Sequence, residues 1–153
     1  MISAHWYTRG TLVQSAAKPR QVYDMYGFPK ELYELKYEPA GCADLTRAVT
    51  DLLGEGVEVD DSWGIDHGTW SILVHIFPQA DIPVVQLSIN GLIDARQSYE
   101  LGQKLASLRE KGYLIMAAAT SSTTCAASNG RMSTAIPPPT ASTSPSIGHR
   151  SAR

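Results

Sequence analysis

The sequence predicts an α/β fold, in which a partial, mostly parallel sheet is flanked by helices and followed by a disordered C-terminal tail. Three observations lead to this prediction. Segments with helical apolar spacing alternate with short apolar runs. One run, residues 83–89, is apolar on both faces, which is typical of a central parallel strand. Finally, residues 117–153 contain no Asp, Glu, Leu, Val or aromatic side chain, so they cannot form a core.

The composition is that of an ordinary globular protein, with 43% apolar and 18% charged residues in a chain of 153. A net charge of -2 gives no reason to expect nucleic acid or an anionic membrane as a partner. No apolar run is long enough to cross a bilayer, and no secretory signal is recognisable. Cys42 and Cys125 lack metal-type spacing, so we expect reduced thiols in a cytoplasmic protein.

The first two segments combine a strand with an aromatic-rich excursion. Residues 1–7 resemble the end of a buried strand, where His5 would face the ligand side of an α/β sheet or simply pack on Trp6. Residues 8–39 are expected to form a long irregular segment over the edge of the sheet, called the aromatic excursion below, in which Pro29 begins a short helix that ends at Leu35. The aromatic side chains of this excursion could line a pocket for a flat ligand, but a small satellite core is the favoured interpretation.

The next elements follow from apolar periodicity and from turn residues. Helices are expected at residues 43–53, where Gly54 supplies the C-terminal cap, at 69–77, and at 94–111, where Asp94 starts the helix and Gly112 ends it. Short strands are expected at residues 57–59, 83–89 and 113–118. His75 lies off the apolar stripe of its helix and should face solvent.

The stretch 61–90 contains the most informative cluster, Trp-Gly-Ile-Asp-His-Gly at residues 63–68. Its two glycines allow a tight turn, which would leave the His67 imidazole beside the Asp66 carboxylate. Such a pair can hold one histidine tautomer in place for acid–base or metal chemistry. The alternative is a capped helix start with a satisfied histidine, and spacing alone favours that alternative.

Several stretches together resemble the class III extradiol ring-cleavage dioxygenases. The resemblance is carried by Ser-Ala-His-Trp at residues 3–6, Gly-Phe-Pro at 27–29, the cluster at 63–68, residues 80–88 and Gly-Gln-Lys-Leu at 102–105. The most similar branch is the 4,5-DOPA extradiol dioxygenase-like group, which has the catalytic B-subunit fold of protocatechuate 4,5-dioxygenase. The resemblance covers residues 1–116.

The resemblance implies a mononuclear non-haem metal, Fe(II) or in some members Zn(II), that opens a catechol ring with O2. His5 matches the metal ligand of the Ser-Ala-His-Trp motif. His67 matches the Asp-His-Gly histidine near the substrate, for which we expect hydrogen bonding or proton transfer rather than ligation. The expected partners are therefore a small aromatic catechol and O2.

Two further family motifs are not found in this sequence. A Gly-His-Gly-Ser-Pro motif that carries another ligand would precede residue 1, and a Gly-Asn-Val-Val-His-Asn motif would follow residue 118, where Ala-Thr-Ser-Ser-Thr-Thr stands instead. With His5 alone from the family's ligand set, tight metal binding is not expected. Residues 1–118 are thus interpreted as a fragment of a catalytic domain.

The tail at residues 119–153 suggests an explanation of its own. Reading the codons of residues 118–130 one frame over, with permitted third bases, gives Gly-Asn-Val-Val-His-Asn-Leu-Arg-Arg-Val-Glu-Trp, which contains the absent motif. We interpret the tail as out-of-frame translation, and the alternative is a genuine low-complexity linker. Three functions remain open for the chain: an extradiol dioxygenase, an inactive fragment, and a metal-free module that binds aromatic ligands.

Overall fold

A computed structural model describes residues 1–118 of the chain. The expectations for residues 119–153, that they are a disordered or out-of-frame tail, lie outside the described residues. Cys125 lies outside them too, whereas Cys42 is a free thiol.

Five short strands form one sheet in the order β3-β2-β4-β1-β5. Their bounds are β1 Ile2–Thr8, β2 Leu12–Val13, β3 Glu58–Val59, β4 Leu87–Asn90 and β5 Ala117–Ala118. β1 pairs in parallel with β4 and β5, and β2 pairs in parallel with β3. β2 and β4 are antiparallel. The mostly parallel sheet predicted from the sequence is therefore confirmed.

Three of the helices in residues 1–118 begin at a residue whose side chain caps the helix. The bounds of the helices are α1 Lys30–Glu34, α2 Ala43–Leu53, α3 His67–Ile76 and α4 Ala95–Leu105, with 3-10 turns η1 Gly54–Gly56 after α2 and η2 Ala106–Lys111 after α4. Gly54 ends α2 with a φ of 59°, a conformation that suits glycine. Asp94 and Gln97 form a reciprocal capping box at the start of α4.

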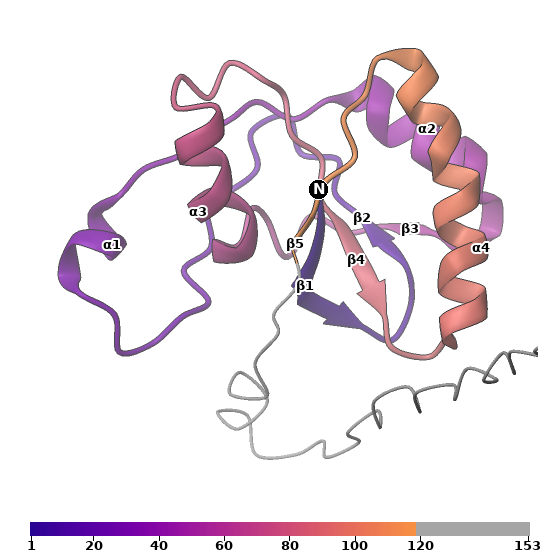
Figure 1. Cartoon of the computed structure of the whole chain (residues 1–153), viewed down its shortest axis with the longest axis horizontal. Helices are drawn as coiled ribbons and strands as arrows, with labels where there is room; N and C mark the ends of the chain where they lie inside the picture. Colours follow the sequence, from indigo (N-terminus) through magenta and orange to yellow (C-terminus); the bar gives the residue numbers. More distant parts are fainter. Residues whose placement is uncertain (119–153) are drawn as a thin grey trace, which may run out of the picture. The chain divides into compact units, whose positions relative to one another are not determined.

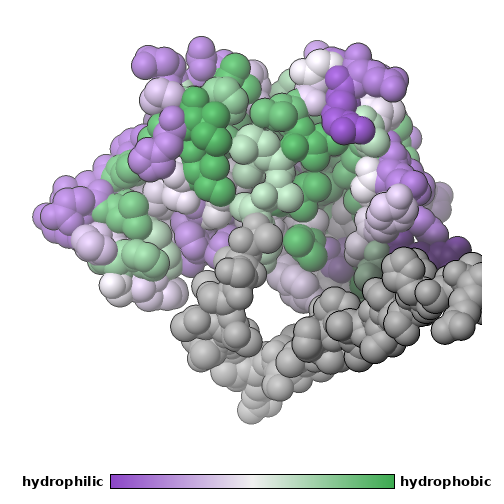
Figure 2. Space-filling model, viewed as in Figure 1, coloured by the Kyte–Doolittle hydropathy of each residue, from purple (hydrophilic) through white to green (hydrophobic). Residues whose placement is uncertain are grey.

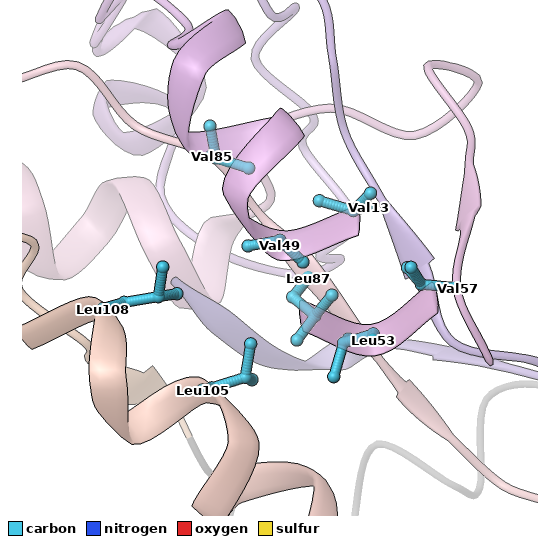
Figure 3. Close-up of a cluster of buried hydrophobic side chains, with 8 residues drawn as sticks. All are labelled: Val13, Val49, Leu53, Val57, Val85, Leu87, Leu105 and Leu108. Carbon is cyan, nitrogen blue, oxygen red and sulfur yellow. The ribbon is translucent and has the colours of Figure 1, made fainter. Parts of the chain in front are cut away.

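One face of the sheet is covered by α2 and α4, which lie beside each other (Figure 1). Their inward side chains pack on β2, on β4 and on the segment that enters β4. Figure 3 shows this apolar cluster, which contains Val13, Val49, Leu53, Val57, Val85, Leu87, Leu105 and Leu108. The apolar stripes of residues 43–53 and 94–111 therefore face the core as the sequence predicted.

The other apolar cluster belongs to α3 and the aromatic excursion. Its buried members are Met25, Tyr37, Ile65, Trp70, Leu73 and Val84. Neighbouring residues Val84 and Val85 belong to different clusters, as expected for extended chain that alternates between two faces. Tyr23 and Tyr33 pack against this cluster, which agrees with the favoured interpretation of a satellite core.

Several strands differ from the sequence prediction. Residues 12–13 form a strand inside the sheet, although the sequence placed them in an excursion. Residues 84–86 are buried, yet only Leu87–Asn90 has strand geometry. In the segment expected as a strand at residues 113–118, only Ala117–Ala118 pairs, and Leu114 is exposed. Runs of two to four residues are too short for a period-two pattern to locate.

Apolar surface gathers in the middle of the face in Figure 2, over α3 and the segment between η2 and β5. Exposed apolar side chains of these segments include Ile72, Ile76 and Leu114. Among residues 1–118, no helix is long and apolar enough to span a bilayer.

Candidate functional site

His5 lies on β1 at a point where the pairing with β4 is irregular. Ile2 is opposite Leu87, but Tyr7 is opposite Ile89, so β1 has extra residues between these two pairs. Such bulges bend a strand and redirect its side chains, and they are frequent beside active sites. His5 is therefore inside the strand rather than at its end, and its side chain is 11% exposed.

Asp66 forms the N-cap of α3 and ties this helix to the sheet. Its fully buried carboxylate accepts hydrogen bonds from the Ser3 hydroxyl at 2.9 Å, the Thr69 backbone N–H at 3.1 Å and the Trp63 indole N–H at 3.1 Å. The Gln86 side-chain amide donates to the same carboxylate. Four donors offset the cost of burying this charge, and they fix the start of α3 against β1 and against the segment that enters β4.

Ser3 connects this network to His5. Its hydroxyl donates to Asp66 and accepts the backbone N–H of His5 at 3.2 Å. The Ser-Ala-His-Trp segment, the Asp-His-Gly segment and Gln86 therefore meet in one buried polar network, although they are distant in sequence. The network explains why serine, aspartate and glutamine occur among apolar residues at the centre of the fold.

The two glycines near the Asp-His pair, Gly64 and Gly68, are required for different structural reasons. Gly64 has a φ of 134°, and a side chain there would also collide with the backbone oxygen of Arg20. Gly68 lies against His5, where an added Cβ would be 2.4 Å from His5 Cδ2. The first glycine permits the turn before α3, and the second permits close approach of helix and imidazole.

A third group, Asp24, reaches the two histidines from the aromatic excursion. Its Oδ1 lies 2.9 Å from Nδ1 of His67 and accepts the His67 backbone N–H, also at 2.9 Å. Its Oδ2 lies 3.7 Å from Nδ1 of His5. The imidazoles of His5 and His67 have ring centroids 4.0 Å apart, with planes tilted by 53°. Two imidazoles thus share one carboxylate.

Asp24 and His67 shift each other's pKa. Burial acts to raise the pKa of Asp24, but contacts with the ring and backbone N–H of His67 outweigh it, so this pKa is lowered. Contact with Asp24 raises the pKa of His67, even though burial opposes protonation. The contact of 2.9 Å between His67 Nδ1 and Asp24 Oδ1 becomes an ion pair when the imidazole is protonated.

The sequence predicted that a carboxylate would lie beside His67, but the pairing with Asp66 was wrong. Asp66 faces the buried network as a helix cap, which agrees with the alternative of a capped helix start. The carboxylate in contact with the imidazole is Asp24, which sequence reasoning missed. Asp24 is 43 residues from His67, so no local spacing could have found it. The available signal was a lone acid in the aromatic-rich segment before Gly27.

The donor set at this site fits a divalent metal ion. His5, Asp24 and His67 each offer a nitrogen or oxygen atom, and these atoms all lie within 4.8 Å of one another. Two imidazoles with one carboxylate suit Fe(II), Zn(II) and other divalent first-row metals. The sequence supplied His5 as a ligand, and the fold places two further polar groups, those of Asp24 and His67, within reach of the same ion. His75, by contrast, is exposed on α3 as predicted.

Comparison with known proteins gives a consistent result. Residues 1–125 match the family model described as the catalytic LigB subunit of aromatic ring-opening dioxygenase. The chain is 42% identical over 120 residues to 4,5-DOPA dioxygenase extradiol of Escherichia coli K12, covering 77% of this chain and 44% of that protein. It is 42% identical over 122 residues to the protein of the same name from Beta vulgaris, covering 77% of this chain and 46% of that one.

A solved structure supports the same relationship. A crystal structure of an uncharacterized protein from Escherichia coli K12 superposes with a TM-score of 0.61 at 38% identity. The match covers 76% of this chain and 43% of that chain. The present chain therefore spans less than half the length of these relatives.

Proposed function

The chain belongs to the family of the catalytic LigB subunit of aromatic ring-opening dioxygenases, and on this premise we propose that it acts in extradiol cleavage of a catechol-type aromatic by O2. In this reaction the ring opens beside its two hydroxyl groups, and both atoms of O2 enter the product. The observation that carries the proposal is the pair of imidazoles, His5 and His67, held 4.0 Å apart within the segment that matches the family.

We assign His5 the role of metal ligand and His67 that of acid–base group. When bound, a mononuclear metal ion would supply a Lewis acid for the catechol oxygens, and Fe(II), unlike redox-inert Zn(II), would also activate O2. His67 is 20% exposed, so a substrate hydroxyl can approach it. A neutral imidazole at this point would take a proton from the catechol and later return it.

The assignment is tested with the full chain loaded anaerobically with Fe(II) and then mixed with a catechol and air. The yellow ring-opened product is followed by its visible absorbance. His5→Gln should lower metal affinity together with the rate. His67→Gln should retain the metal but lower kcat by about 10²- to 10⁴-fold, the usual contribution of a general base. His75→Gln changes an exposed histidine of the same helix and should leave the rate unchanged.

A second candidate is a module that binds aromatic ligands without turnover. Tyr26 and Phe28 are 85% and 52% exposed, and they follow Asp24 in the chain. Exposed aromatic rings close to Asp24 in sequence could hold a flat ligand by stacking. Saturable catechol binding by the metal-loaded chain without product would favour this module, and neither binding nor product would favour an inactive fragment.

The origin of residues 119–153 is a separate proposal. We interpret them as out-of-frame translation of a catalytic domain, of which residues 1–118 are a fragment. The support is the absence of acidic and aromatic residues and the family motif obtained in the neighbouring frame. Sequencing the coding DNA tests it, because codons that do not yield Val-Val-His-Asn in that frame would exclude it. We also propose a cytoplasmic location, which rests on the expectation of reduced thiols.

A further inference from the structure

We propose that Asp24 is a positioning residue that holds His5 and His67 with their Nδ1 atoms toward one shared carboxylate. The Nε2 atom of each ring is then the nitrogen that does the chemistry, metal ligation for His5 and proton transfer for His67. The inference rests on the proposed function for these two roles. The arrangement of carboxylate and imidazoles can be tested without any turnover.

The argument begins with the contacts of the carboxylate. Both imidazoles present the same atom to Asp24, Nδ1 of His67 at 2.9 Å and Nδ1 of His5 at 3.7 Å. A carboxylate beside Nδ1 favours the tautomer in which Nδ1 carries the proton. The lone pair then resides on Nε2, as both a metal ligand and a general base require. Carboxylates commonly orient metal-bound histidines in this manner.

The same contacts argue against a role for Asp24 as a direct metal ligand. Its Oδ1 is already engaged by the backbone N–H and by the ring nitrogen of His67, both at 2.9 Å. Its Oδ2 is directed toward His5. A metal ion bound to this carboxylate would have to displace these contacts, whereas an orienting role uses them as they are.

The segment that carries Asp24 is fixed independently of the two histidines. Val22 and Ile65 are joined by a backbone hydrogen bond of 2.8 Å, and the Trp70 indole donates to the Val22 carbonyl at 2.9 Å. Met25, the residue after Asp24, is buried in the cluster around α3. The carboxylate is therefore held by hydrogen bonds of the chain before it and by burial of the residue after it, as a positioning residue requires.

The shared carboxylate couples the two histidines to each other. Loss of the Asp24 charge should release both rings at once, although they come from β1 and α3. We therefore expect Asp24→Asn to alter His67 and to weaken metal binding at His5 together. A merely structural aspartate would lower stability without changing which ring nitrogen carries the proton.

The first test is a long-range ¹H–¹⁵N spectrum of the histidine side chains in the metal-free full chain, with a chelator, at about pH 9, where histidines are ordinarily neutral. In the wild-type protein we expect His5 and His67 to be protonated at Nδ1, and exposed His75 to show the tautomer mixture of free histidine. Asp24→Asn should shift His67 toward that mixture. Protonation of His67 at Nε2 in the wild-type protein would overturn the proposal, even if the variant does not fold.

The second test is titration with Co(II), followed by its visible absorption. Asp24→Asn should weaken Co(II) binding by about 10- to 100-fold, the usual effect of removing a carboxylate that orients a ligand. The control is Asp61→Asn, because Asp61 also accepts backbone N–H groups, from Ser15 and Ala16. It should leave Co(II) affinity unchanged. An unchanged affinity in Asp24→Asn, or a loss far beyond 100-fold that marks a direct ligand, would contradict the proposal.

The two proposals fail in different ways. If the metal-loaded chain makes no ring-opened product but His67 is protonated at Nδ1 only when Asp24 is present, the proposed function is wrong and the positioning role stands. If product forms and the tautomers are indifferent to Asp24, the positioning role is wrong and the proposed function stands.

Discussion

Gly68 of α3 lies against the His5 imidazole of β1 so closely that no side chain fits between them. A Cβ at residue 68 would be 2.4 Å from Cδ2 and 3.1 Å from Nε2 of His5. The position of His5, the proposed metal ligand, therefore depends on a helix residue that has no side chain. This relationship explains why glycine follows the Asp-His pair.

Gly68→Ala should displace His5 and lower the free energy of unfolding by about 1–3 kcal/mol, the usual cost of overpacking. It should also weaken Co(II) binding, because the imidazole moves. Urea unfolding and Co(II) titration measure the two effects. Gly102→Ala is the matched control, since a Cβ there meets nothing within 4 Å. Being inside α4, it should instead stabilise the protein by about 0.5–1 kcal/mol.

Asp66→Asn should destabilise the protein by about 2–4 kcal/mol, because the amide cannot accept all four donors and leaves a buried group unpaired. Asp94→Asn is the control, because Asp94 caps an exposed helix end and asparagine caps as well as aspartate. It should change the free energy of unfolding by less than about 0.5 kcal/mol. Equal effects of the two substitutions would show that the buried network around Asp66 does not anchor α3.

The ion pair between Asp24 and His67 should make stability depend on pH in the metal-free protein. The pKa of Asp24 is lowered from 3.8, so its contribution is present above that pH and is lost as the pH falls. The pKa of His67 is raised from 6.5, so its contribution is present below 6.5 and is lost as the pH rises through the folded value. The contribution is therefore greatest between these two values, and thermal unfolding across this range measures it.

Asp24→Asn should flatten the pH profile on both its acidic and its neutral side. Asp61→Asn is the comparison. Burial acts to raise the pKa of Asp61, but hydrogen bonds from Ser15 and Ala16 outweigh it and lower this pKa, with no contribution from a histidine of residues 1–118. Asp61→Asn should alter the acidic side alone. A neutral side that persists in Asp24→Asn would mean that another group perturbs His67.

Local sequence features predicted the elements whose signals lie within one segment. The helix at residues 43–53 was located to the residue, because an apolar stripe and a capping glycine coincide there. Asp94 and Gly112 likewise marked the two ends of the α4–η2 segment. β2 was missed, because its two residues gain strand geometry only from pairing with β3 and β4.

The candidate site was only partly predictable, for a related reason. His5 and His67 were found through short motifs, but their shared partner Asp24 comes from a different segment. The partner is placed by the pairing of Val22 with Ile65 and by the burial of Met25, which are tertiary contacts. Sequence spacing carries no record of such contacts, so it could offer only the adjacent Asp66 as a carboxylate partner, beside the favoured alternative of a capped helix start.

The most direct measurement of the proposed activity is a single turnover of the Fe(II)-loaded chain with a catechol and ¹⁸O₂, followed by mass spectrometry of the product. We predict a ring-opened product that carries both labelled atoms, and no such product from His5→Gln. A ring-opened product without any labelled atom, or no product from folded, metal-loaded protein, would contradict the assignment of extradiol cleavage to this chain, whereas loss of one label reflects exchange of the aldehyde oxygen with water.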